Sequence, residues 1–109
     1  MSDLADRVRK ARESWVEAGG RRWLIRRPTH FQMWRHDGTG ADLVFASVVG
    51  WELKELDIVP GGGGNVPPFD PEAFREWIED KVELIADLGA HVEAAIKAFN
   101  DKREAASGN

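Results

Sequence analysis

A run of four glycines, Gly61 to Gly64, constrains the fold of this chain more than any other feature of its sequence. Pro60 precedes the run and the pair Pro67-Pro68 follows it. Because glycine loses more backbone entropy in a helix or strand than any other residue, residues 60–68 are predicted to form a loop. With 109 residues the chain is long enough for one small hydrophobic core, so we expect a single domain over residues 1–109.

A helix is predicted to begin directly after this loop. Asp70 is a suitable N-cap because its carboxylate accepts hydrogen bonds from the free amides of the first turn, and Pro71 suits the first helical position. Phe69 and Phe74 have the spacing of a hydrophobic staple, which fixes how the loop enters the helix. The helix is expected over the segment PEAFREWIEDK, residues 71–81.

The remaining C-terminal residues predict a second helix and a tail. From Val82 to Phe99, apolar residues recur at helical spacing with charged residues between them, as on one face of an amphipathic helix. Asp80 and Glu83 have the spacing of a capping box, so either a new helix begins there or the two helices run on as one. The polar tail, residues 102–109, is predicted to be disordered.

Two short helices are predicted in the N-terminal part of the chain. Residues 2–12 carry a thin apolar stripe behind an N-cap at Ser2, and a helix this short either docks on the body of the domain or is mobile. Thr29 is a suitable cap for a second short helix over residues 30–36, with a partly buried aromatic face. The segment DGTG, residues 37–40, is predicted to be a turn.

A β-hairpin is predicted between these two helices. The pair Gly19-Gly20 separates two apolar runs, and both of its residues tolerate the positive φ angles of a two-residue hairpin turn. Alternation along the second strand places Trp23 and Ile25 on the same face. An alternative interpretation continues the first helix through Ala18 and leaves only one strand.

The run ADLVFASVVGW, residues 41–51, is predicted to be a buried central helix with its C-cap at Gly50. The β-branched residues of this run are also compatible with a strand. Residues 52–59 are predicted to form a short turn or an extended segment. The expected fold class is therefore α+β and mainly helical: an N-terminal helix, a β-hairpin, a central buried helix and a C-terminal helix pair.

Charge divides unevenly along the chain. Residues 1–54 contain ten Lys and Arg against seven Asp and Glu, whereas residues 55–109 contain five against twelve. A split of this kind can steer association between copies, so self-association is one expectation, although two ordinarily solvated faces are the simpler interpretation.

Several functional classes find no support in the sequence. The N-terminus lacks the apolar stretch of a signal peptide, and no run of residues is long and apolar enough to span a membrane. The chain has no cysteine, and His30 and His36 are not spaced to bind one metal ion from one helical face. The glycine run lacks the Lys-Ser/Thr of a phosphate-binding loop. We therefore expect no enzymatic activity, no cofactor and no metal.

A protein-binding surface is the remaining expectation, because five Trp and five Phe are difficult to bury completely in so small a domain. Arginines beside such aromatics are common in protein contacts, and the cluster of arginines between residues 21 and 35 makes nucleic-acid binding a less favoured alternative. The aromatic residues expected in the core and the contact are Trp23, Trp51, Phe69, Phe74 and Trp77. The charged residues expected to recognise a partner are Arg26 and Arg27.

The sequence between residues 15 and 78 resembles a group of small tail assembly proteins, or tail assembly chaperones, of tailed bacteriophages and prophages. The resemblance rests on three segments: RRPT at 26–29, VVGW at 48–51, and PFD at 68–70, which leads into the C-terminal helices. The glycine run is longer here than in that group. All three segments are structural in kind and none is a catalytic fingerprint.

This resemblance implies a non-enzymatic protein that binds tape-measure or tail-tube subunits in the host bacterial cytoplasm until the tube polymerises. Amphipathic helices with an acidic outer face are suited to such a role, because they can cover the apolar stripe of a partner and stay soluble. Two alternatives are a minor structural component of the virion, at the tail or the head-tail junction, and a small nucleic-acid-binding regulator.

Overall fold

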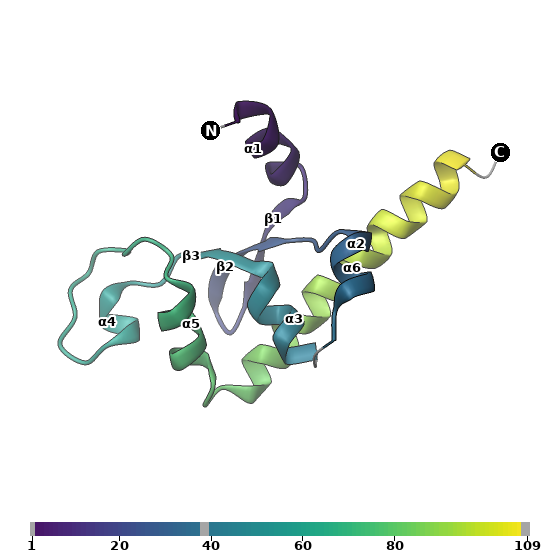
Figure 1. Cartoon of the computed structure of the whole chain (residues 1–109). Helices are drawn as coiled ribbons and strands as arrows, with labels where there is room; N and C mark the ends of the chain where they lie inside the picture. Colours follow the sequence, from purple (N-terminus) through teal and green to yellow (C-terminus); the bar gives the residue numbers. More distant parts are fainter. Residues whose placement is uncertain (1, 38–39, 108–109) are drawn as a thin grey trace.

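The computed structural model describes residues 2–37 and 40–107, and within these residues the chain forms six helices and one three-stranded antiparallel sheet. This architecture confirms the predicted fold class, α+β and mainly helical. In chain order (Figure 1) the elements are α1 (Asp3–Lys10), β1 (Glu13–Ala18), β2 (Arg21–Arg26), α2 (His30–Arg35), α3 (Gly40–Ser47), β3 (Val48–Trp51), α4 (Glu55–Ile58), α5 (Pro71–Ile78) and α6 (Val82–Ser107).

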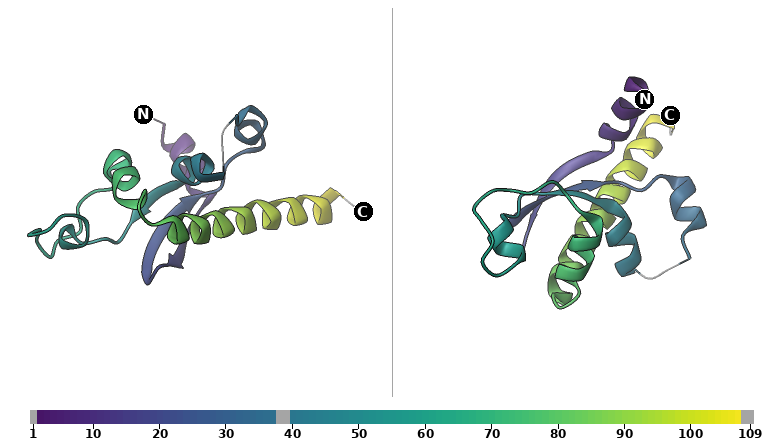
Figure 2. Two further views of the ribbon diagram at one scale, coloured as in Figure 1. Left: turned by 90° about the horizontal axis from the view of Figure 1, so that it is seen from below. Right: turned by 60° about the vertical axis from the view of Figure 1, so that its left-hand side comes forward.

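The core lies between the sheet and the helices α3, α5 and α6. Helix α6 runs as a long rod across one side of the domain, where it contacts α3, α5 and β1 (Figure 2). Trp23 and Ile25 of β2 point into the core as the alternation predicted, and Phe74 of α5 and Leu88 of α6 meet them there. The other buried apolar residues are Ala18, Val44, Val48, Trp51, Leu53, Ile78, Leu84 and Val92.

The predicted hairpin is confirmed, and the alternative of a helix through Ala18 is wrong. β1 pairs antiparallel with β2 from Glu13–Arg26 at the open end to Ala18–Arg21 beside the turn. Gly19 and Gly20 adopt φ angles of 61° and 74°, which residues other than glycine rarely adopt.

The central segment differs from the prediction of one helix over residues 41–51. Helix α3 ends at Ser47, and the chain continues as β3, which pairs antiparallel with the free edge of β2. Gly50 is therefore not a helix C-cap. It lies opposite Leu24 in the sheet, where a Cβ at position 50 would come within 2.9 Å of the Leu24 Cβ. A glycine at this position lets the two strands pair.

The loop over residues 60–68 folds back on a short helix that the sequence did not predict. Residues 55–58 of the expected turn or extended segment form α4, and the amides of Glu55 and Leu56 donate to the carbonyls of Asn65 and Gly63, at 2.8 and 2.9 Å. Gly62 lies so close that a Cβ there would meet the Glu55 carbonyl group at 2.7 Å. The glycine run thus forms an ordered cover over α4.

The first C-terminal helix begins as predicted but ends at Ile78 and not at residue 81, whereas the second extends further than predicted. The Asp70 carboxylate accepts from the amides of Glu72 and Ala73, and the rings of Phe69 and Phe74 are 5.7 Å apart, as a staple requires. The two helices are separate, since α5 ends at Ile78 and α6 begins at Val82. The prediction of disorder over residues 102–109 is wrong for residues 102–107, which continue α6, and residues 108–109 lie outside the described part.

The two short N-terminal helices are capped as predicted. The Ser2 hydroxyl accepts from the Ala5 amide at the start of α1, and Thr29 and Gln32 form a capping box at the start of α2. No residue of α1 is buried, and the helix stands away from the body of the domain (Figure 1). The predicted turn at 37–40 lies partly outside the described residues, which omit 38 and 39.

Candidate protein-binding surfaces

Three of the five aromatic residues expected in the core and the contact lie in the core. Trp23 and Phe74 are fully buried, with ring centroids 5.6 Å apart, and Trp51 is only 5% exposed. The Trp23 indole N–H donates to the carbonyl of Ala18 at 3.0 Å, which satisfies its polar atom inside the core. All three side chains stabilise the fold. Trp23 and Phe74 offer no surface to a partner, whereas Trp51 keeps an edge in the lining of a surface groove described below.

Phe69 and Trp77 are half-buried at the edge of the same aromatic cluster. The Phe69 ring packs edge-on against Trp51 at 4.9 Å, and Trp77 lies 5.9 Å from Trp23. The Trp77 indole donates to the carbonyl of Asp57 at 3.0 Å, which ties α5 to α4. Of the five, these two are the most accessible to a partner.

The two arginines expected to recognise a partner are engaged within the chain. Arg26 donates to the Glu13 carboxylate across the hairpin, with its closest nitrogen 2.6 Å away. The Arg27 guanidinium lies over the ring of Phe99, 3.6 Å from its centroid. Burial, followed by the nearby charge of Arg12, lowers the pKa of Arg27. Both arginines therefore contribute to holding the hairpin and α6 in place.

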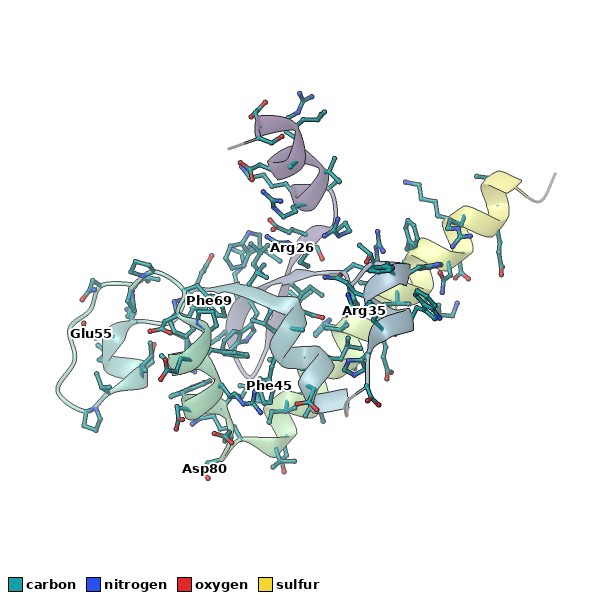
Figure 3. The ribbon with its side chains drawn as sticks, in the orientation of Figure 1. Arg26, Arg35, Phe45, Glu55, Phe69 and Asp80 are labelled. Atoms are coloured by element: carbon teal, nitrogen blue, oxygen red, sulfur yellow. The ribbon has the colours of Figure 1, made fainter. Side chains whose placement is uncertain are left out.

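The arginine cluster of the sequence does not form one basic patch. Arg21 pairs with Asp57 at 3.0 Å and Arg22 with Glu52 at 2.7 Å. Figure 3 shows Arg26 near the α1 end of the sheet and Arg35 well away from it, on α2.

An exposed aromatic pair on α2 was not among the expected site residues, and the expectation of a partly buried aromatic face on this helix is wrong. Phe31 and Trp34 are 57% and 80% exposed, and their ring centroids are 5.7 Å apart. Residues three apart share a face of a helix, whereas Met33 is turned toward the opposite side and is half-buried. That spacing is the signal by which the sequence alone could have found this pair, which we call the α2 aromatic face.

A second surface is an open apolar groove between β3, α4 and the start of α5, with a volume of 570 Å³. Among the described residues of its lining, Glu55 and Asp70 are the only charged ones. Glu55 and another lining residue, Phe69, are labelled in Figure 3. Its apolar lining includes Trp51, Ile58, Val59, Pro67, Phe69 and Ala73. We call this surface the apolar groove.

Two hydrogen bonds brace the walls of the apolar groove. The Trp51 indole N–H donates to the Pro67 carbonyl at 2.9 Å, and the Glu55 carboxylate accepts from the Gly63 amide at 2.9 Å. The loop is therefore held against β3 and α4 from both sides, and the groove is formed before any partner binds.

Neither surface carries the side chains of a metal site. Within residues 2–37 and 40–107, no group of three or more His, Cys, Asp or Glu side chains could hold a metal ion. No helix in the same part of the chain is both long and apolar enough to cross a membrane. Comparison with protein-family models, with curated proteins and with solved structures finds no match to this chain.

Proposed function

We propose that this chain is a non-enzymatic tail assembly protein of the chaperone type, which binds tape-measure or tail-tube subunits of a tailed bacteriophage during tail morphogenesis. The proposal combines the sequence resemblance with one structural observation, the exposure of Phe31 and Trp34 on α2. It assigns the protein to the host bacterial cytoplasm while tails are being built.

The α2 aromatic face supports a binding role because neither of its two rings packs against the hydrophobic core. Trp34 is the most exposed large apolar side chain of the described residues, at 80%. Exposed aromatics flanked by arginine are enriched where proteins bind one another, and Arg35 lies over the Phe31 ring at 5.6 Å. An apolar helical segment of an unassembled tail subunit is the kind of partner that such a face would keep soluble.

The test is co-purification from cells that express the tagged chain together with the neighbouring tail genes. Mass spectrometry would identify the bound proteins and would measure this chain in purified particles. The double variant Phe31→Ser/Trp34→Ser removes the α2 aromatic face. Trp15→Ser is the matched control, because Trp15 is an exposed tryptophan on β1, away from α2.

We expect tape-measure or tail-tube protein to co-purify with the wild type and with the control, but not with the double variant. We also expect this chain to be absent from purified particles. A fixed number of copies in finished particles would instead favour the alternative, a minor structural component of the tail or head-tail junction. Failure to recover any tail protein, together with absence of this chain from particles, would overturn both.

A further inference from the structure

Helix α1 carries an apolar stripe that the described part of the chain leaves largely exposed, although its C-terminal end borders a hollow beside Phe99. Leu4 and Val8 are 67% and 55% exposed, and Ala11 follows one turn later. At about 100° per residue, these three residues share one face, Arg7 lies beside it, and Asp6 and Arg9 lie on the opposite face. A helix of eight residues is marginal in water by itself, so this stripe needs a partner surface to contribute to stability.

The same chain presents a surface that matches this helix. The apolar groove is lined almost entirely by aliphatic, proline and aromatic side chains. Its two carboxylates, Glu55 and Asp70, each use one oxygen to accept from nearby amides, and among the described residues the second oxygen of each makes no hydrogen bond. An apolar floor with acidic groups complements an apolar stripe flanked by arginine, as in other helix-in-groove contacts.

The helix is held away from the groove of its own chain. The backbone N–H of Arg27 donates to the carbonyl of Arg12 at 2.8 Å, which extends the β1–β2 pairing up to the end of α1. α1 therefore leaves from the open end of the hairpin, whereas Trp51 of the groove pairs with Trp23, nearer the turn. In Figure 1, α1 lies at the top of the molecule, apart from the loop that follows β3.

We infer that α1 of one copy of this chain binds in the apolar groove of a second copy. The inference is independent of the proposed function, since it concerns a different helix and a partner that is the chain itself. A contact made by one eight-residue helix lies in the small, transient class of interfaces, below about 1,200 Å² of buried surface. Association is therefore expected to be weak and to depend on concentration.

Two variants separate the two halves of the contact. Leu4→Gln/Val8→Gln removes the apolar stripe but keeps the groove, and Val59→Arg blocks the groove but keeps the stripe. Both changes are at exposed positions, so the fold of each copy should persist, which circular dichroism would verify. The matched control, Asp6→Gln/Arg9→Gln, alters the opposite face of α1 without changing the net charge.

Sedimentation velocity over a broad range of concentrations is the measurement. The wild type and the control should associate as concentration rises, and each of the two variants alone should remain monomeric. An equimolar mixture of the two variants should recover a heterodimer, because one supplies the groove and the other supplies the helix. A monomeric wild type at all concentrations, or a mixture that fails to recover association, would overturn the inference.

Nuclear magnetic resonance locates the contact on the surface. A synthetic peptide of residues 1–12 is titrated into the isotopically labelled Leu4→Gln/Val8→Gln chain, whose groove is intact. The indole signal of Trp51 and the amides of residues 55–73 should shift. A peptide carrying the same two substitutions should leave them unchanged, and shifts confined to another surface would contradict the inference.

Discussion

Substitution of Gly62 by alanine tests whether the glycine run is an ordered part of the fold. A Cβ at this position would lie 2.7 Å from both the carbonyl carbon and the oxygen of Glu55, and these backbone atoms cannot rotate away. The loop or α4 must shift to accommodate the methyl group. Forcing an extra methyl group into a packed region costs about 1–3 kcal/mol.

Gly64→Ala is a matched control two residues away, because a Cβ at Gly64 would meet nothing within 4 Å. Neither glycine has the positive φ angle that disfavours alanine. Both substitutions restrict the unfolded chain alike, which stabilises the folded state by about 0.4–1 kcal/mol in each case. The difference between the two variants therefore isolates the contact with Glu55.

The assay is urea unfolding of both variants, followed by tryptophan fluorescence. We expect the free energy of unfolding of Gly62→Ala to be about 1–3 kcal/mol lower than that of Gly64→Ala. Equal stability of the two variants would refute the claim that the loop is packed against α4.

Three further predictions concern other elements. Asp70→Ala removes the cap of α5 and should cost about 0.5–2 kcal/mol in urea unfolding, with Asp70→Asn retaining most of the stability. Gly50→Ala forces a Cβ against Leu24 at 2.9 Å and should lower the midpoint of unfolding and shift the amide signals of β2. The pKa of Asp57 is lowered, chiefly because the Lys54 amide donates to its carboxylate. A carboxyl group with a lowered pKa in the folded state stabilises the protein at pH values above its unfolded-state pKa. This stabilisation is lost as the pH falls through the folded-state pKa. Asp57→Asn should therefore reduce the loss of stability with falling pH below about pH 4.

The parts of the fold that depend only on residues adjacent in the sequence could be predicted from the sequence. The caps at Ser2, Thr29 and Asp70 each act over two or three residues, so their side chains are sufficient to identify helix starts. The hairpin turn at Gly19-Gly20 is local in the same way. Strand β3 could not be predicted with the same rules, because residues 48–51 become a strand only where the edge of β2 is free to pair with them.

The candidate surfaces were harder to predict than the fold, because burial of an aromatic side chain depends on what lies opposite it. Trp23 is buried since β2 is the middle strand and α5 covers its face with Phe74. Trp34 belongs to a helix of six residues whose half-buried Met33 is turned the other way, which leaves Phe31 and Trp34 exposed together. Composition indicated that ten Trp and Phe side chains are difficult to bury in a small core, but the aromatic face of this helix was expected to be partly buried. The three-residue spacing of Phe31 and Trp34 could have shown that they share a face. A six-residue helix such as α2 can pack only one of its sides against the domain. An aromatic pair three residues apart on the other side therefore stays exposed.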